Sequence, residues 1–334
     1  MNKNTICLTG AYGFVGRALC TTLIKSNRSI RALVRKIDLK RNIPEVNYFE
    51  TQVINLNQKL EDIFIDCDCI IHCVGKAHNM NNDNLDNYLI DNIEFTKQFT
   101  EIAIKTGVRR IIFLSTIKVN GENTNNNDKI KVFNHIDRPN PQDSYGISKL
   151  KAKKVLWDIS LKIGLEVVIL RLPLVYGSGV KGNLKRLMKL INFRVPLPFK
   201  GIRNKRSLIG IDNLIDLIIR CIEHPNVAGK TFLVCDGEDL STPDLLRHVA
   251  SSMERSTRLF PFPISLLKLF GFAIGKSSEI NRLTNSLQVD ISFTRKTLNW
   301  SPPLTVQEGI RCELLIYNKE VLIKISMVII HFKT

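Results

Sequence analysis

The feature that most constrains this chain is the glycine-rich segment T-G-A-Y-G-F-V-G at 9–16, directly after the apolar run T-I-C-L at 5–8. The run is short, apolar and partly β-branched, as a buried parallel strand should be. The residues that follow place apolar side chains at 15, 18, 19 and 23, which is helical spacing. Glycines between a strand and a helix indicate a phosphate-binding turn rather than an ordinary tight turn.

The three glycines of this turn have separate expected roles. Gly10 allows the sharp turn, Gly13 allows close approach of a pyrophosphate, and Gly16 lets helix and strand pack closely. The free N–H groups and the dipole of the helix N-terminus then face an anion. We therefore predict a dinucleotide site formed by Gly10, Tyr12, Gly13, Phe14, Val15 and Gly16.

Strand and helix patterns alternate along the first half of the chain. Apolar, strand-like runs occur at 30–34, 68–74, 110–115 and 166–172, and helical patterns at 58–64, 86–106 and 145–163. This alternation predicts an α/β fold with a Rossmann-type doubly wound parallel sheet. Residues 120–143 are rich in Asn, Asp and Pro and are expected to form a loop over the site.

A second, less regular part follows Pro173. Helical patterns near 182–192, 213–224, 242–254 and 263–274 indicate a smaller, mainly helical lobe. We expect a dinucleotide-binding domain at 1–172, a substrate-binding lobe at 173–312 and a C-terminal tail at 313–334. The segment 207–235 is the one that could return to the first domain.

The net charge of +17 over 334 residues is high for a globular chain. It could indicate nucleic acid, an anionic membrane surface or a polyphosphate ligand. The basic residues are spread along the chain without a long Lys/Arg tract, so we expect a solvated basic surface and no nucleic-acid partner. The eight cysteines form no paired C-x-x-C set, which argues against a metal site and favours buried thiols in a reducing cytoplasm.

Two apolar stretches raise the question of a membrane. Residues 259–275 are interrupted by prolines, a lysine and a glycine, and residues 321–332 are apolar for only about twelve positions, against the roughly 20 that a spanning helix needs. We expect no transmembrane span and no signal peptide before the first strand, hence a cytoplasmic protein. Peripheral attachment at a membrane interface remains open for so basic a chain.

A candidate catalytic group is the segment Y-G-I-S-K at 145–149. Tyr145 and Lys149 share one face of a helix, and an ammonium near a phenol lowers the tyrosine pKa from about 10. Tyrosine then becomes a usable acid and base near neutral pH. Ser115 and Thr116 end a predicted strand, where ligands bind in such sheets, and could hold the substrate oxygen. Together with the glycine turn, these residues predict hydride-transfer chemistry.

The ordered motifs resemble the extended short-chain dehydrogenase/reductase family, the NAD-dependent epimerase/dehydratases that modify nucleotide sugars. The resemblance covers nearly the whole chain, from Thr5 to about Ile310. It is carried by T-G-x-x-G-x-x-G at 9–16, the strand 68–74, Tyr88 with Asn92 and Thr96, Ser115-Thr116, Tyr145 with Lys149, R-x-x-x-V-Y-G at 171–177, Val289-Asp290, and L-N-W-S-P at 298–302.

The resemblance implies roles for individual residues. Thr116 and Tyr145 would hydrogen-bond the reacting sugar oxygen, with Tyr145 exchanging the proton. Lys149 would bind the nicotinamide ribose. Further cofactor contacts would come from Val74, Asn92 and Pro173, and substrate contacts from Ser115, Thr116, Asn183 and Arg206. Arg206 also fits a plain surface cation within the basic run 203–206.

Departures from the family pattern affect the cofactor. Many relatives end the second strand with an acid that holds the adenosine ribose, whereas this chain has Val34-Arg35-Lys36. Arginine can accommodate the 2′-phosphate of NADP, although Asp38 could substitute for the missing acid. Asn55-Leu56 replaces an acid near the adenine, and Asn120 replaces the tyrosine of the family's V-Y-G. The cofactor is therefore NADP(H) or NAD(H).

The leading interpretation is a reductase of a 4-keto nucleotide sugar, with a UDP-hexosamine as the expected substrate, that uses NADPH and serves surface polysaccharide (lipopolysaccharide O-antigen) synthesis. The alternative is a UDP-glucose or UDP-N-acetylglucosamine 4-epimerase with bound NAD. A non-catalytic dinucleotide sensor is an outside alternative, which the set Thr116, Tyr145 and Lys149 disfavours. A surface binder of nucleic acid or membrane is a third class. The sequence leaves the oligomeric state open, and a homodimer is compatible with it.

Overall fold

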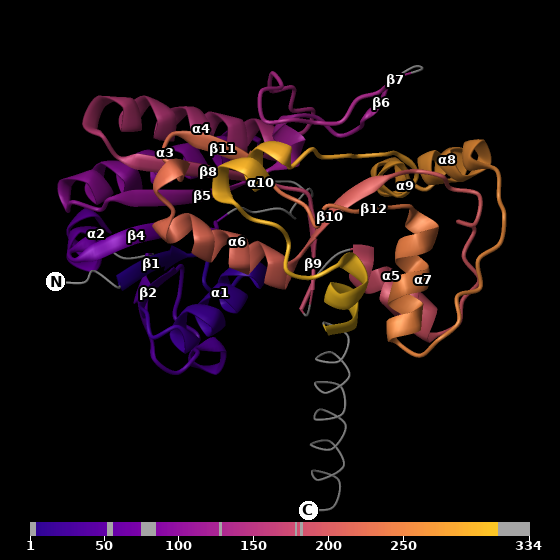
Figure 1. Cartoon of the computed structure of the whole chain (residues 1–334), viewed down its shortest axis with the longest axis horizontal. Helices are drawn as coiled ribbons and strands as arrows, with labels where there is room; N and C mark the ends of the chain where they lie inside the picture. Colours follow the sequence, from indigo (N-terminus) through magenta and orange to yellow (C-terminus); the bar gives the residue numbers. More distant parts are fainter. Residues whose placement is uncertain are drawn as a thin grey trace, which may run out of the picture.

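A parallel sheet of seven strands forms the centre of the larger lobe (Figure 1). The computed structural model describes residues 5–51, 56–74, 85–126, 129–177, 179–180 and 183–312. The predicted tail at 313–334 lies outside these residues. The strands follow the order β3 (Val46–Glu50), β2 (Ser29–Val34), β1 (Thr5–Thr9), β4 (Cys67–His72), β5 (Arg110–Thr116), β8 (Glu166–Leu172) and β11 (Lys230–Leu233).

The direction in which successive strands are added to the sheet changes at β1, so a switch point lies between β1 and β4. From β1 the chain proceeds outward through β2 and β3, then returns to place β4 on the other side of β1. In open parallel sheets, ligands bind outside the carboxyl ends of the strands at such a switch point. The glycine turn follows β1 directly, so it lies at this point. The predicted Rossmann-type doubly wound sheet is confirmed.

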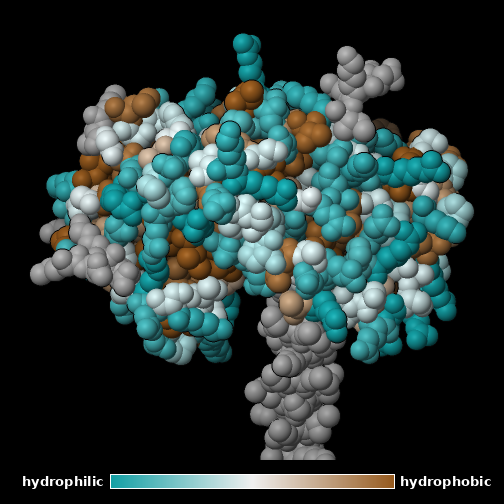
Figure 2. All heavy atoms as spheres, viewed as in Figure 1, coloured by the Kyte–Doolittle hydropathy of each residue, from teal (hydrophilic) through white to brown (hydrophobic). Residues whose placement is uncertain are grey.

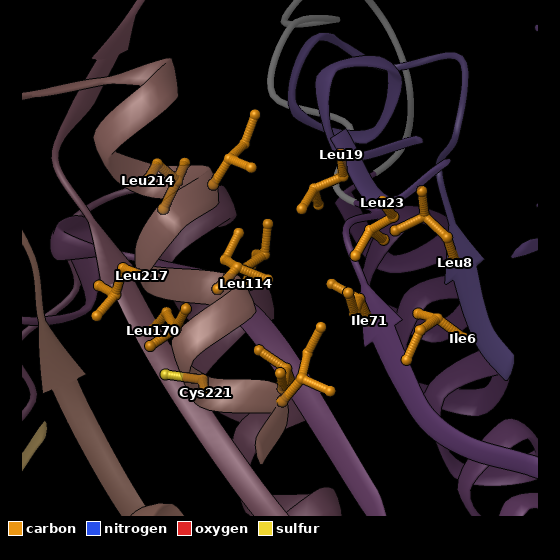
Figure 3. Packing of buried hydrophobic residues seen from close by; sticks show 14 of the residues in the cluster. Ile6, Leu8, Leu19, Leu23, Ile71, Leu114, Leu170, Leu214, Leu217 and Cys221 are labelled. Atoms are coloured by element: carbon orange, nitrogen blue, oxygen red, sulfur yellow. The ribbon is translucent and has the colours of Figure 1, made fainter. Parts of the chain in front are cut away.

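Helices cover both faces of the sheet (Figure 1). On one face, α1 (Phe14–Lys25) and α6 (Ile211–Glu223) pack against the strands through one apolar cluster, part of which Figure 3 shows. In that view Leu19 and Leu23 of α1, and Leu214 and Leu217 of α6, point toward the strands. On the other face, residues of α2 (Leu56–Phe64), α3 (Leu85–Lys105) and α4 (Ser144–Ile163) form a second cluster.

The second lobe is mainly helical, as predicted, but it also contains a small sheet. Three short strands, β9 (Leu174–Tyr176), β10 (Arg206–Gly210) and β12 (Asp239–Leu240), lie in the order β12-β10-β9. They are two to five residues long, too short for a clear period in the sequence. The helices of this lobe are α5 (Asn183–Asn192), α7 (Thr242–Ser252), α8 (Ile264–Ala273) and α9 (Ser277–Thr284).

Connecting segments join the two lobes. β11 pairs with β8 in the large sheet, so the segment 207–235 contributes one strand to each sheet. The predicted loop at 120–143 includes a small hairpin of β6 (Asn125–Asn126) and β7 (Lys129–Ile130), and Phe133 pairs with Val289. Further elements are α10 (Ser292–Leu298) and the 3₁₀ turns η1 (Leu39–Arg41), η2 (Ile117–Val119) and η3 (Pro225–Val227).

Candidate active site

The glycine turn folds tightly onto itself between β1 and α1. Gly10 has a φ of +75°, a left-handed conformation that favours glycine, and its carbonyl accepts the Gly13 N–H at 2.8 Å. A Cβ on Gly16 would lie 2.2 Å from the Gly10 carbonyl oxygen. Gly16 is therefore required because the first turn of α1 contacts the backbone of the preceding turn.

The start of α1 is open to an anion. Its N-cap is Gly13, which provides no side-chain hydrogen bond, and the first turn contains no acidic residue. The first N–H groups of a helix have no partner within the helix. Phe14 and Val15 contribute N–H groups to this first turn. The structure thus fits the pyrophosphate of a dinucleotide at the predicted position.

Tyr12 is held firmly by the segment that follows β2. Its hydroxyl donates to Asn42 Oδ1 at 2.5 Å and accepts the Asp38 N–H at 3.0 Å, while its ring stacks on Tyr48. The Arg41 guanidinium lies 4.7 Å from the centre of the Tyr12 ring. Tyr12 therefore connects the glycine turn to the loop at 35–42.

Arg35 lies where the sequence placed it, exposed and directly after β2. Neighbouring acids are engaged with backbone: Glu50, at the end of β3, accepts the Ile37 N–H at 2.6 Å, and Asp38 accepts the Lys40 N–H. An exposed guanidinium beside the switch point can reach a ligand there.

Lys149 is the most constrained charged group of the site. It is 5% exposed, and its Nζ donates to Val74 O at 2.7 Å and Leu114 O at 2.9 Å. These carbonyls lie just after β4 and near the end of β5, so the lysine bridges the two strands. Burial lowers the pKa of Lys149 from 10.5 to about 8. Its Nζ lies 6.0 Å from the centre of the Tyr145 ring.

Ser115 and Thr116 end β5, as predicted, and both are buried. Thr116 Oγ1 accepts the Lys118 N–H at 3.3 Å and thereby starts η2. Ser115 Oγ is one of the few buried side-chain atoms without a hydrogen-bond partner among the described residues. Buried hydroxyl groups are normally hydrogen-bonded, so we expect Ser115 Oγ to bond a group from outside the chain, such as a ligand or water.

A clamp that the sequence did not reveal fixes the start of α4. The Lys118 ammonium forms ion pairs with Glu122 at 2.8 Å and with Asp143. Asp143 also caps α4 by accepting the Gly146 N–H at 2.7 Å. Burial opposes ionisation of Asp143, but the contacts with Lys118 and Gly146 leave its pKa below the usual value. The contacts of Lys118 and Asp143 therefore fix the position of Tyr145 relative to Thr116.

Arg171 supports the same region from β8. It is buried, its Nη1 donates to Asn120 Oδ1 at 2.8 Å, and its Nε has no partner among the described residues. Burial lowers the pKa of Arg171 to about 10. Asn120, which replaces a family tyrosine, thus ties the loop after η2 to β8. Pro173 follows and is buried between β8 and β9.

The predicted substrate residues of the second lobe are only partly described. Arg206 begins β10, is half-buried, and its Nη1 donates to Asn285 O at 3.0 Å. Burial, and then the charge of Arg282, lower the pKa of Arg206 to about 10. Arg282 Nε is buried without a partner among the described residues, and no sequence motif pointed to this residue. Asn92 and Asn183 lie in α3 and α5, but their side chains lie outside the described residues.

Comparisons with known proteins test these expectations. The model of the NAD dependent epimerase/dehydratase family matches residues 6–235, more than half of the chain. A UDP-glucose 4-epimerase of Vibrio cholerae is 42% identical over 312 residues, covering 92% of this chain and 93% of the relative. The chain belongs to the NAD-dependent epimerase/dehydratase family. The extended short-chain dehydrogenase/reductase resemblance is thereby confirmed.

Other relatives extend this result. A dTDP-4-dehydro-6-deoxyglucose reductase of Escherichia coli is 22% identical, covering 92% of this chain and 96% of the relative. A structure of Bacillus cereus UDP-glucuronic acid 4-epimerase in complex with NAD has a TM-score of 0.71 and 20% identity, covering 92% of this chain and 97% of that chain. The similarity to this solved structure shows that the two proteins share a fold. The chain is thus an enzyme of an NAD(P)-dependent family that contains nucleotide-sugar epimerases and reductases.

The identities of these two relatives change the order of the two enzyme interpretations. The epimerase relative is far more similar to this chain than the reductase relative is. The comparisons therefore favour the 4-epimerase alternative over the 4-keto reductase that the sequence put first. Within the described residues, no helix is long and apolar enough to span a membrane, and no cluster of three or more potential metal ligands occurs.

Proposed function

We propose that this chain is a UDP-hexose 4-epimerase that keeps one NAD bound through its catalytic cycle. The observation that carries the proposal is the 42% identity with a UDP-glucose 4-epimerase along nearly the whole of both chains. The buried Lys149 beside Tyr145, with Thr116 at the end of the neighbouring strand β5, supports it. The dinucleotide, when bound, supplies the group that accepts hydrogen from C4 of the sugar and returns it.

The protein's own residues then handle the proton. Tyr145 would take the proton of the C4 hydroxyl through its phenolic oxygen and give it back when C4 is reduced on the other face. The ammonium of Lys149 would stabilise the phenolate, and the two carbonyls that hold Lys149 would keep it in place. Thr116 would donate a hydrogen bond to O4 of the sugar, and Ser115 supplies a further hydroxyl in the same strand end.

The dinucleotide would lie along the switch point of the large sheet. Gly10, Tyr12, Gly13, Phe14, Val15 and Gly16 would form its pyrophosphate site, with Arg35 at the adenosine end and Val74, Asn92 and Pro173 toward the nicotinamide. The open N-terminus of α1 and the glycine contacts support this placement. We propose residues 5–172 with β11 as the dinucleotide-binding unit.

The sugar nucleotide would be held by the lobe at 173–312. Its diphosphate needs cations, and Arg206 and Arg282 lie close enough for one to lower the pKa of the other. Arg282 Nε, buried without a partner among the described residues, has hydrogen-bonding capacity to offer. Asn183, at the start of α5, is a further candidate contact.

The 4-keto reductase is the second candidate, and Arg35 is the residue that favours it. A reductase consumes reducing power at every turnover, which cells supply largely as NADPH, and an exposed arginine after β2 suits a 2′-phosphate.

A direct test is to incubate the purified full chain with UDP-galactose and no added dinucleotide, and to follow the anomeric proton signals by NMR. Appearance of UDP-glucose supports the epimerase. Turnover that requires a 4-keto sugar and NADPH supports the reductase.

A further inference from the structure

Helix α8 of the second lobe exposes most of its apolar side chains. Only Leu267 and Gly271 of its ten residues are buried. Leu269 is 62% exposed and Phe272 is 76% exposed, and Phe270 and Ile274 are similarly open. Scattered single apolar residues on a surface are normal, but a helix with this many of them exposed together indicates an interaction surface.

Helix α8 packs against α9 and against the segment that precedes it. Gly271 packs closely against α9, where a Cβ would lie 2.6 Å from Ile280 Cγ1. The Phe270 ring contacts Phe262, whose ring contacts Phe260 at 6.5 Å in an edge-on arrangement. Phe260 is itself 40% exposed. The apolar surface therefore extends from Phe260 through α8 to Ile274; we call it the α8 surface.

The segment that contains the α8 surface is basic. From Arg255 to Lys276 the chain carries four basic residues and no acidic one. These four, Arg255, Arg258, Lys268 and Lys276, are all exposed, and Lys276 pairs with Glu279 of α9 at 3.4 Å. Lys268 lies within α8 itself, between the apolar residues. An exposed apolar helix within a basic segment complements a partner whose interior is apolar and whose outer layer carries negative charge.

The position of α8 leaves this surface accessible. Figure 1 shows α8 at the outer end of the second lobe, far from the seven-stranded sheet and its switch point. The face in Figure 2 is mostly hydrophilic, with hydrophobic side chains in smaller groups among them. A flat partner on α8 would therefore leave the dinucleotide site of the first lobe uncovered.

We propose that the α8 surface docks the second lobe onto a bilayer that contains anionic phospholipid. The helix would lie in the plane of the interface, with Leu269, Phe270 and Phe272 among the lipid chains and the basic residues at the headgroups. Ten residues make about 15 Å of helix, half of the roughly 30 Å hydrocarbon core, so α8 cannot cross. A second copy of the chain fits less well, because a two-fold contact through this surface would bring the basic segment of one copy near that of the other.

Vesicle flotation of the purified full chain tests the proposal. Vesicles of phosphatidylcholine are compared with vesicles that also contain phosphatidylglycerol, at low and high salt. We expect binding to the anionic vesicles that weakens with salt. The variant Leu269→Gln/Phe272→Gln should bind at least about tenfold more weakly, and Arg258→Gln/Lys268→Gln about fivefold more weakly for each charge removed.

A matched control removes two exposed apolar residues elsewhere. Leu161 on α4 is 78% exposed and Ile65 after α2 is 51% exposed, so Leu161→Gln/Ile65→Gln should bind vesicles as the unchanged chain does. Thermal midpoint and dinucleotide affinity, measured for each variant, separate loss of binding from misfolding. Unchanged flotation of Leu269→Gln/Phe272→Gln overturns the proposal. Absence of vesicle binding by the unchanged chain also overturns it, and a shift from dimer to monomer in Leu269→Gln/Phe272→Gln would then make a second copy the partner.

Discussion

The ammonium of Lys149 lies 6.0 Å from the centre of the Tyr145 ring, one helical turn away on α4. Two carbonyls at the ends of β4 and β5 hold the lysine, so its charge is fixed between the sheet and the tyrosine. Burial strengthens electrostatic interactions between such groups because little water screens them. The arrangement can stabilise a phenolate at the carboxyl edge of the sheet, where the substrate would lie.

Replacing Tyr145 with phenylalanine should strongly slow turnover and leave cofactor binding intact. The change removes only the hydroxyl that carries the proton, and loss of a general acid and base costs typically about 10²–10⁴-fold in rate. We expect kcat to fall by that factor, measured with saturating UDP-sugar, and the dinucleotide affinity to change little. A variant that turns over at nearly the normal rate would remove Tyr145 from the mechanism.

Activity should fall as the pH rises through about 8. The pKa of Lys149 is lowered from 10.5 to about 8 by burial, so the lysine loses its charge above that pH and no longer stabilises the phenolate. The measurement is kcat/KM against pH, which reports the free enzyme.

Lys153 supplies the control for this pH dependence. It lies one turn further along α4, and burial, with a contribution from Arg171, lowers its pKa to about 8 as well. Lys153→Gln should retain the descending limb of the profile. If the limb disappears in Lys153→Gln, or if the unchanged enzyme has a flat profile through this range, Lys149 is not the group that titrates.

Gly16→Ala should impair dinucleotide binding and stability together. The added methyl would meet the Gly10 carbonyl at 2.2 Å, so the turn or the helix must move. Overpacking of this kind costs about 1–3 kcal/mol. Gly201→Ala is the matched control, because its nearest new contact, with Phe262 O, is an ordinary 3.8 Å. Dinucleotide titration and thermal unfolding measure both effects, and equal behaviour of the two variants would refute the role of Gly16.

Arg35→Asp should weaken the binding of NADP(H) relative to the binding of NAD(H). A charge-assisted contact with the 2′-phosphate is worth about 1.5–3 kcal/mol, which corresponds to roughly tenfold to a hundredfold in the ratio of the two affinities. Lys25→Asp makes a similar charge change at the far end of α1 and should leave the ratio unchanged. An unaltered ratio in Arg35→Asp would show that Arg35 does not face the adenosine ribose.

Much of the first domain could be predicted because its local signals agree. The glycine turn and the apolar runs of β1, β4, β5 and β8 each indicate the same layered sheet. β3 was missed, since V-N-Y-F-E mixes polar and apolar residues, as expected of an edge strand that is only partly buried. The strands of the second lobe were missed because they are short.

The candidate site was predictable only where its residues belong to local motifs. Tyr145 and Lys149 follow from helical spacing. Lys118 and Asp143 are 25 positions apart in the sequence, and Arg206 and Arg282 are 76 positions apart. Only the fold brings the members of each pair together. The side chains of Asn92 and Asn183 stay predictions.

The most direct test of the proposed 4-epimerase uses UDP-galactose with deuterium at C4 of the sugar. An epimerase removes this hydrogen and returns it to C4 of the same sugar. Purified enzyme, without added dinucleotide, should therefore convert the labelled compound to UDP-glucose that retains deuterium at C4, as measured by mass spectrometry and NMR. Absence of conversion by folded protein, combined with NADPH-dependent reduction of a 4-keto sugar, would contradict the account.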